Sequence, residues 1–414
     1  MANSDVDVVV VGGGAAGIAA ARRLHEASVR CLLIEARSRL GGRAWTVNAS
    51  GHAIDLGCGW LHSADRNPWC DVARTQGRTI DKTPPPWRRA SLPVGFATAD
   101  QSEFFESLSA FYDRLELAAA QAPDAPAATL LNPGDRWNPL INAVSTYANG
   151  DELDRISIHD LARYDDTSVN WRILDGYGTT IAAHADGLPV MLDCPVHRID
   201  HAGKRLRVET AKGVLVADQV IVALPSAVLA EEEGLFAPTL PEKTETARGL
   251  PLGLDDKLFL SLDNAEEFEK DSRLFGRTDR TATGAYHVRP FGRPQIEAYF
   301  GGSLARELEA GGEQAFFSFA ISELVGLLGH AFARRLRPIH VHLWGRDPFA
   351  RGSYSHALPG AADHRSVLAA PVDRRLFFAG EATSPNDFST AHGAFFTGVR
   401  AAEEAIAALG STNA

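Results

Sequence analysis

The hydrophobic positions near the N-terminus form two short runs, separated by a glycine-rich turn and a helical segment. Val6–Val11 is apolar and β-branched, interrupted only by Asp7, as is typical of a buried parallel strand. Ala15–Ala27 is rich in alanine and is expected to be helical. Cys31–Ile34 is a second apolar run, and it ends at Glu35. The pattern predicts a β-α-β unit.

The turn inside this unit, Gly12-Gly13-Gly14-Ala15-Ala16-Gly17, fits the motif G-x-G-x-x-G. In that motif Gly12 allows the tight turn, Gly14 lets a pyrophosphate approach the backbone, and Gly17 lets the helix pack on the strand. The helix N-terminus offers N–H donors to the phosphates, and Glu35 can accept hydrogen bonds from an adenosine ribose. A glycine-rich turn of another α/β fold is the alternative, but strand, helix and acid together favour a dinucleotide site.

Two further glycine-rich turns follow. After Glu35 come Ala36 and Arg37, and then Gly41-Gly42-Arg43, in which a fixed cation suits the far side of a pyrophosphate. The turn Gly57-Cys58-Gly59-Trp60 lets the backbone approach a flat ring closely, and Trp60 could pack on that ring. His62, taken alone, is more typical of a structural or surface histidine than of a catalyst.

A helical insertion is expected from about Thr83, after which Pro84–Pro86 breaks the pattern. The spacing of apolar residues predicts helices over Glu103–Ala120, Pro139–Tyr147 and Ile158–Tyr164. A further helix, Ile181–Ala185, is expected with Thr179 or Thr180 as its cap. Short strands are predicted at Val190–Leu192, Val196–Ile199, Leu206–Glu209 and Val214–Val216. Ala217–Pro225 is predicted to be a buried strand that ends at its proline and returns to the first domain.

The C-terminal half predicts a second sheet and then a return to the first one. Lys257 stands just before the apolar run Leu258–Leu260; from these residues alone, a surface ion pair with Asp255 or Asp256 is favoured. Further strands are predicted at Tyr286–His287, Ile296–Phe300 and Ile339–Trp344, with a helix at Phe316–Leu328. The chain closes with the strand Leu376–Ala379, the turn Gly380-Glu381, and a helix from Thr390-Ala391 to about Ala408.

Composition narrows the classes of partner. The net charge of −11 disfavours nucleic acid and anionic membranes. We expect no membrane span and no signal peptide. The four cysteines, Cys31, Cys58, Cys70 and Cys194, are scattered without C-x-x-C, as expected of structural thiols in a reducing cytoplasm. No His/Cys/Asp cluster has metal-ligand spacing, so no metal is expected.

Taken in order, these segments resemble the flavin amine oxidase family, which includes monoamine oxidases, polyamine oxidases, bacterial amine oxidases and histone lysine demethylases. The resemblance covers nearly the whole chain and is weakest between about Thr83 and Asp166, where substrate preference is usually set. The matching segments are Val9–Gly17 with Glu35, Gly41-Gly42-Arg43, Asp55–His62, Pro195–Ile199, Ala217–Pro225, Trp344–Tyr354 and Phe378–Arg400.

The resemblance implies an α/β fold with a discontinuous Rossmann-like FAD-binding domain and an α+β substrate-binding domain, a mixed sheet with a helical insertion. The implied FAD-binding domain comprises residues 1–82, 177–248 and 345–414, and the substrate-binding domain residues 83–176 and 249–344. Non-covalent FAD is expected, because Ser353 stands where monoamine oxidases carry the cysteine that is linked to the flavin.

The resemblance also assigns roles to residues. Lys257 would bind a water near flavin N5, Trp344 and Tyr354 would lie beside the flavin, and Thr390 replaces a second aromatic ring of the substrate cage. The FAD contacts carried over are Gly12, Gly14, Ala15, Ala16, Gly17, Glu35, Ala36, Arg37, Gly41, Gly42, Arg43, Gly57, Cys58, Gly59, Trp60, Val196 on the adenine side, Gly380, Glu381 on the ribityl chain and Ala391 on flavin O2.

The implied reaction is oxidation of a small-molecule amine to an imine, with O2 as acceptor and hydrogen peroxide as product. One alternative is an L-amino-acid oxidase or a flavin desaturase of the same fold; an amino-acid oxidase needs a buried arginine, for which Arg172, Arg289 and Arg293 are candidates. Another is a flavin-binding protein with degenerate catalysis. The sequence does not name the amine, and it leaves the oligomeric state open, a homodimer included.

Overall fold

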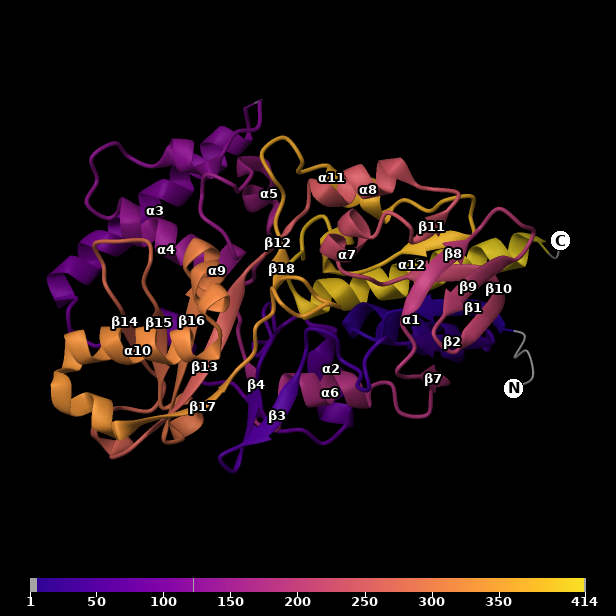
Figure 1. The fold of residues 1–414 in the computed structure, drawn as a ribbon. Helices are drawn as coiled ribbons and strands as arrows, with labels where there is room; N and C mark the ends of the chain where they lie inside the picture. Colours follow the sequence, from indigo (N-terminus) through magenta and orange to yellow (C-terminus); the bar gives the residue numbers. More distant parts are fainter. Residues whose placement is uncertain (1–5, 122, 413–414) are drawn as a thin grey trace.

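The computed structural model describes residues 6–121 and 123–412; residues 1–5, 122 and 413–414 of the expected domain ranges lie outside the described residues. Two large sheets lie toward opposite ends of the molecule, with long connections running between them (Figure 1). The chain enters the first sheet at its N-terminus and returns to it twice. Every cofactor contact expected from the sequence lies on or beside this first sheet or on the connections between the two sheets.

The first sheet has eight strands in the order β11-β8-β9-β10-β1-β2-β7, with β19 paired to β10. Its core is parallel: β1 pairs with β2 and β10, β2 with β7, and β10 with β19. The strands are β1 Val6–Val11, β2 Cys31–Ile34, β7 Val190–Met191, β8 Val196–Asp200, β9 Leu206–Thr210, β10 Gly213–Val222, β11 Phe236–Ala237 and β19 Leu376–Phe378.

The continuous apolar run of β1 reflects burial on both faces of the sheet. Val8 and Val10 pack into a core with helices α1 (Ala15–Glu26) and α12 (Ala391–Thr412). Val9 and Val11 pack into a second core on the opposite face. Burying each valine contributes about 1.5–3 kcal/mol, so the two faces together fix the register of this strand.

Helices α1 and α12 lie side by side along the first sheet (Figure 1) although they come from opposite ends of the chain. A Cβ atom at Gly398 would lie 2.1 Å from the carbonyl oxygen of Ala16, so the two helices cross at a glycine. This contact brings the start of α12 back beside the glycine-rich turn that begins α1.

The sequence-based prediction of separate strands at Val214–Val216 and Ala217–Pro225 is wrong, because Gly213–Val222 is one continuous strand, β10. Its first half pairs antiparallel with β9, and its second half enters the parallel sheet between β1 and β19. No turn residue interrupts it, and the change from alternating to continuous burial along the strand marks the change of neighbours rather than a break.

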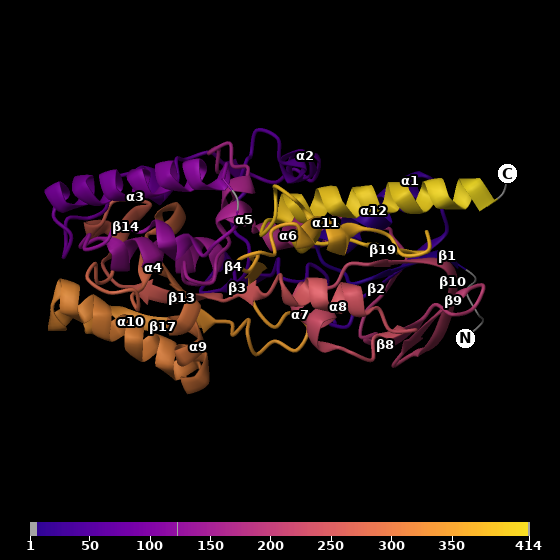
Figure 2. The same ribbon diagram turned by 90° about the horizontal axis from the view of Figure 1, so that it is seen from above.

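The second sheet has five strands in the order β14-β15-β16-β13-β17, all antiparallel to their neighbours. One face carries aliphatic and aromatic residues, including Leu258, Ile296 and Phe300, that pack on helix α10. Helices α3 and α4 lie on the other side of this sheet (Figure 2). The strands are β13 Asp255–Leu262, β14 Ser272–Phe275, β15 Ala285–Val288, β16 Gln295–Gly301 and β17 Leu336–Val341.

The helical insertion is present, and α3 begins earlier than its apolar spacing predicted, at Thr98 rather than Glu103. The remaining helices connect the sheets or cover them: α2 Pro68–Thr75, α3 Thr98–Ala119, α4 Asn138–Asn149, α5 Ile158–Arg163, α6 Tyr177–Ala183, α7 Ser226–Glu231, α8 Pro241–Arg248, α9 Gly302–Gly311, α10 Glu313–Leu328 and α11 His364–Ala369. Three two-stranded pairs complete the fold: β3 Thr46–Ala49 with β4 His52–Asp55, β5 Ile80–Asp81 with β6 Arg172–Ile173, and β12 Leu252–Gly253 with β18 Tyr354–Ser355.

The expected cap of the helix near Ile181 is wrong. Helix α6 begins at Tyr177, after Gly176, and its first amides are held by a carboxylate from a distant part of the chain. The two oxygens of Asp55 accept hydrogen bonds from the backbone N–H groups of Tyr177 (3.0 Å) and Gly178 (3.2 Å). A carboxylate at a helix N-terminus satisfies free donors and complements the helix dipole.

Within residues 6–121 and 123–412, no helix combines the length and the apolar character that crossing a bilayer would require.

Candidate functional site

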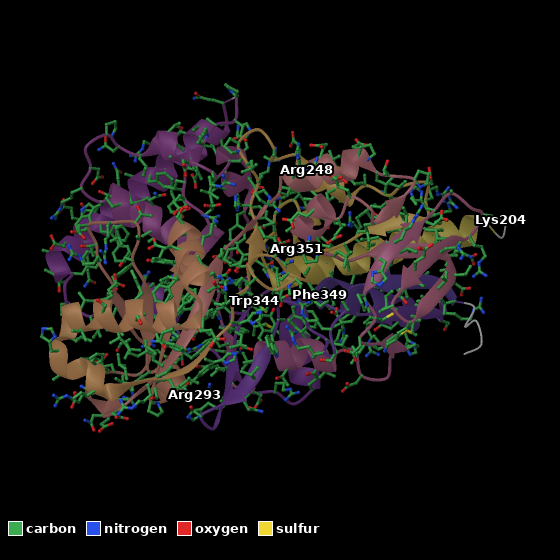
Figure 3. All side chains as sticks on the ribbon, viewed as in Figure 1. Lys204, Arg248, Arg293, Trp344, Phe349 and Arg351 are labelled. Carbon is green, nitrogen blue, oxygen red and sulfur yellow. The ribbon has the colours of Figure 1, made fainter. Side chains whose placement is uncertain are left out.

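A cavity of about 1220 Å³ lies between the two sheets. At one end it is lined by the glycine-rich turn after β1 and by the end of β2, and at the other by the second sheet and helices α3, α4 and α5. Trp344, Phe349 and Arg351, which also line it, lie near the middle of the molecule (Figure 3). All of the site residues expected from the sequence line this cavity except Gly17.

The glycines of the first turn differ in what their missing side chains allow. Gly12 has φ +105°, and a Cβ atom there would lie 2.6 Å from the carbonyl oxygen of Ala223. A Cβ atom at Gly17 would lie 1.8 Å from the carbonyl oxygen of Gly12, so Gly17 is required for helix α1 to pack on the strand. Gly14 is different: its backbone is extended, and the nearest atom to an added Cβ is 3.9 Å away, at Gly42. The room at Gly14 therefore opens into the cavity.

Glu35 stands at the end of β2, where the motif requires an acid. The residue is only 4% exposed. One oxygen accepts a hydrogen bond from the N–H of Gly13 (2.7 Å) and the other from the N–H of Arg37 (2.9 Å). These bonds fix the carboxylate beside the turn, and each oxygen keeps a lone pair for a further donor.

Two arginines along this wall are held by carboxylates from the C-terminal part of the chain. Arg37 pairs with Asp347. Arg43 donates to the carboxylate of Glu381 (3.0 Å) and to the carbonyl oxygen of Ser353 (2.8 Å). Burial alone would raise the pKa of Glu381, but the charge of Arg43 and the hydrogen bonds to this carboxylate lower it. One wall of the cavity is therefore formed jointly by segments from the N-terminal and the C-terminal parts of the chain.

The glycines of the turn after β4 serve contacts within the chain. A Cβ atom at Gly57 would lie 1.7 Å from the carbonyl oxygen of Arg43, and one at Gly59 would lie 3.2 Å from Nζ of Lys257. Cys58 lines the cavity beside them, and burial raises the pKa of its thiol to about 12. Because these two glycines lack a Cβ atom, the carbonyl group of Arg43 and the ammonium of Lys257 can approach the backbone closely. Both Arg43 and Lys257 line the cavity.

The second sheet presents polar residues to the cavity at alternate positions. Lys257 on β13 is paired with Tyr299 on β16, and Glu297 on β16 with His287 on β15. Because side chains alternate along a strand, these residues share the face opposite the core against α10. The expectation that Lys257 precedes the strand is wrong, since it lies within β13 and its alternation directs it toward the cavity.

The surface ion pair considered for Lys257 is also wrong. Its side chain is only 8% exposed, and its ammonium lies 3.1 Å from Oε1 of Glu297 and donates to the carbonyl oxygen of Asp55 (3.2 Å). Burial would lower the pKa of Lys257, but the carboxylates of Glu297 and Asp55 outweigh it and raise that pKa. The lysine is therefore a buried, charged ammonium at neutral pH.

Aromatic residues also line the cavity. The hydroxyl of Tyr354 donates to the carbonyl oxygen of Tyr147 (2.6 Å), and the indole N–H of Trp344 donates to that of Leu56 (3.1 Å). Thr390 caps α12: its hydroxyl accepts from the N–H of Gly393 (2.9 Å). Tyr299, which sequence reasoning missed, adds a ring 5.4 Å from Nζ of Lys257.

Sequence reasoning underrated two histidines. His62 lines the cavity, with Nδ1 2.6 Å from the side-chain oxygen of Asn170, and burial lowers its pKa. His287 also lines it, and Asp271 lies behind it, 3.0 Å from Nε2. The sequence places His287 in a predicted strand. The pairing of that strand with its neighbours was needed to show that the side chain of His287 faces the cavity.

The three arginines considered for a substrate carboxylate are engaged elsewhere. Arg172 pairs with Asp81 (3.1 Å) and Asp271 (2.9 Å). Arg289 and Arg293 donate to backbone carbonyl groups. None of the three is among the described residues that line the cavity, so the structure does not support them as a carboxylate site.

Comparison with known proteins decides the family. The sequence model of one protein family, the flavin-containing amine oxidoreductases, matches residues 15–78 and 100–406 of the chain. The chain belongs to this family. It is an amine oxidoreductase, and its cofactor is a flavin, FAD.

Individual relatives are distant but cover the chain almost completely. The chain is 28% identical to polyamine oxidase 2 of Arabidopsis thaliana over 96% of its length and 87% of the relative's. It is 29% identical to polyamine oxidase 3 of Oryza sativa subsp. japonica, covering 96% of the chain and 88% of the relative. A solved structure of a putrescine oxidase redesigned in cofactor binding shares the fold, with a TM-score of 0.79 and 18% sequence identity. The match covers 97% of this chain and 99% of the putrescine oxidase chain.

The cavity fits the FAD of this amine oxidoreductase. The open room at Gly14, the fixed acid at Glu35 and the paired cation at Arg43 lie along one wall of a cavity large enough for a dinucleotide. Across from it stands the aromatic and charged face of the second sheet. In the part of the chain that the structure describes, no group of three His, Cys, Asp or Glu side chains is arranged to hold a metal ion.

Proposed function

We propose that this amine oxidoreductase converts a small-molecule amine to an imine, with O2 as electron acceptor and hydrogen peroxide as product. The observation that carries the proposal is that Lys257, a buried ammonium, faces the same cavity as the dinucleotide cradle at Gly14. The amine loses two electrons and two protons, O2 takes them up, and water then hydrolyses the imine to a carbonyl compound and an amine or ammonia.

FAD, when bound, supplies the two-electron acceptor for the C–H bond next to the amine nitrogen. We propose that Gly14 and Arg43 hold its pyrophosphate, that Glu35 holds the adenosine ribose, and that Glu381 holds the ribityl chain. The N-terminus of α12 at Ala391 lines the cavity, and its dipole favours negative charge there by about 0.3–1 kcal/mol or more when buried.

The protein's own groups orient and desolvate the amine. Tyr354, Tyr299 and Trp344 line an aromatic wall that excludes water. Lys257 donates hydrogen bonds from a fixed position and can hold a water molecule at Nζ; its charge is maintained by Glu297. No strong general base is required, because a neutral amine gives up its hydride without prior deprotonation.

We also propose that FAD is bound without a covalent link. The hydroxyl of Ser353 donates to the carbonyl oxygen of Asp255 (2.9 Å) and accepts from its N–H (2.9 Å), and a serine cannot form the thioether. Acid precipitation should release the yellow colour into the supernatant, and colour retained in the pellet would contradict this.

The division of the chain between cofactor and substrate, and its location in the cell, are also part of the proposal. We propose that residues 1–82, 177–248 and 345–414 bind FAD and that residues 83–176 and 249–344 bind the substrate. The four cysteines are free, which supports a cytoplasmic location.

Whether O2 is the electron acceptor is tested by the ratio of peroxide produced to imine formed. Purified enzyme is incubated in air with mono-, di- and polyamines and with amino acids, and O2 consumption and peroxide are measured. The proposal requires one peroxide per imine formed. Oxidation of an amine with an artificial acceptor but without O2 uptake would instead establish a dehydrogenase.

A further inference from the structure

Arg273 lies on the cavity face of the second sheet, at the edge away from Lys257. It is on β14, directly opposite His287 of β15, which is itself opposite Glu297 of β16. Arg273 is one of the residues that line the cavity. Since β15 and β16 separate β14 from β13, three strand spacings of about 4.8 Å place the backbones of Arg273 and Lys257 roughly 14 Å apart.

Arg273 has no partner for its charge within residues 6–121 and 123–412: no hydrogen bond or ion pair is formed by its guanidinium. It lies over a ring instead: the guanidinium carbon is 3.9 Å from the centre of Phe275. Arg172, by contrast, is paired with two carboxylates, and Arg43 with one. An arginine in a cavity wall normally has such a partner.

Toward helices α3 and α4, the surroundings of Arg273 are apolar. Phe275 packs against Phe96 and Phe104, and the cavity wall continues through Leu108 of α3 and Val144 of α4. Burial lowers the pKa of Arg273 to about 10, and Tyr147 rather than a carboxylate opposes that shift. The side chain is still charged at neutral pH, and its planar fork is suited to bind a carboxylate through two parallel hydrogen bonds.

We propose that the amine substrate carries a carboxylate, which Arg273 binds at the far end of the cavity from Lys257. The proposal rests on the amine oxidation proposed above and names the substrate class of that same site. It also implies discrimination: a diamine of equal length would place a second ammonium against the guanidinium, and like charges repel.

The experiment compares three ligands of matched length: an alkylamine, the corresponding ω-amino carboxylate and the corresponding diamine, each over a series of chain lengths. Reduction of the enzyme-bound flavin is followed anaerobically in the wild type, in Arg273→Met and in the matched control Arg277→Met. Arg277 lies two residues beyond β14, is exposed and pairs with Asp279. Arg273→Lys keeps the charge without the fork and replaces Arg273→Met if that variant misfolds.

The wild type should bind the best ω-amino carboxylate about 10- to 100-fold more tightly than the alkylamine, as a charge-assisted pair predicts. Arg273→Met should remove this preference, seen in the apparent Kd, Arg273→Lys should remove part of it, and Arg277→Met should keep it. A wild type that prefers the diamine, or an Arg273→Met variant that keeps the carboxylate preference, would overturn the proposal.

A second measurement separates this proposal from the proposed function. Binding of n-alkanoates, which carry no amine, is measured by calorimetry with the flavin-loaded enzyme. Binding that is lost in Arg273→Met but kept in Arg277→Met supports the carboxylate site even if no amine reduces the flavin, a result that would contradict only the amine oxidation. Alkanoate binding that is absent, or equal in all three proteins, overturns the carboxylate site.

Discussion

The ammonium of Lys257 lies 3.1 Å from the carboxylate of Glu297 on the cavity face of the second sheet, where Lys257 is buried and Glu297 is 14% exposed. Their strands, β13 and β16, are neighbours, and Tyr299 is the direct cross-strand partner of Lys257. Removing one member of a buried pair leaves the other without a counter-charge, which costs more than the pair gains. The charge of Lys257 therefore depends on Glu297.

Glu297→Gln should lower the pKa of Lys257, because it removes the largest contribution that raises it. The wild-type ammonium has a raised pKa, so its stabilising effect is complete at neutral pH and is lost only as the pH rises through that pKa. In the variant this loss should begin at lower pH. The rate of flavin reduction, measured against pH, should show its alkaline limb displaced downward. Glu307→Gln, an exposed carboxylate on α9, should leave the profile unchanged; identical profiles for both variants would contradict the pairing.

Gly14→Ala and Gly17→Ala separate cofactor space from folding. A Cβ atom at Gly14 meets no atom closer than 3.9 Å, so the variant should fold with a free energy of unfolding within about 1 kcal/mol of the wild type. The same Cβ fills the proposed pyrophosphate space and should weaken FAD binding about 10- to 100-fold. Gly17→Ala places a Cβ 1.8 Å from a carbonyl oxygen and should destabilise the apoprotein by about 1–3 kcal/mol or more.

Thermal unfolding of the apoproteins and fluorescence titration with FAD measure the two effects independently. Unchanged FAD affinity in Gly14→Ala would show that the pyrophosphate lies elsewhere.

Asp271→Asn should destabilise the junction of the second sheet with the turn before it. Asp271 is fully buried and contacts Arg172 (2.9 Å), Nε2 of His287 (3.0 Å) and the N–H of Phe291 (2.9 Å). Loss of a buried charge partner costs about 3–5 kcal/mol, which chemical unfolding should detect. Asp279→Asn, exposed, is the matched control.

The pH dependence of this effect has a definite sign. Burial would raise the pKa of Asp271, but His287 and Arg172 bring it well below its usual range. Its stabilising contribution is therefore complete above the unfolded-state pKa of about 3.9 and is lost as the pH falls below it. The variant should show a shallower acid-side loss of stability than the wild type; parallel acid limbs would exclude Asp271 as the source.

The opening unit was predictable because its determinants are local. The strand Val6–Val11, the glycine turn and Glu35 lie within one short stretch, and each has a defined physical requirement. The wall of the cavity formed by Arg43 and Glu381 was accessible only through the family resemblance, since these residues lie 338 positions apart.

Other features depend on pairings that a sequence does not state. Asp55 caps α6 from 122 residues away, and local threonines were the nearer candidates. Arg273 faces the cavity only because β14 pairs with β15 in one register; a shift of one residue would turn it toward the core. The sequence shows that polar residues alternate along β16, at Glu297 and Tyr299. It does not show that β16 pairs with β13, which brings Lys257 beside them.

The central claim is that a flavin in this cavity is reduced by an amine beside Lys257. The most direct measurement is anaerobic mixing of the flavin-loaded enzyme with a panel of amines, with and without a terminal carboxylate, in the wild type and in Lys257→Met. We predict that the wild-type flavin loses its visible absorption with at least one amine, and that Lys257→Met slows its reduction or its reoxidation by O2. A flavin that no amine bleaches, or equal rates of both half-reactions in the two proteins, would contradict the account.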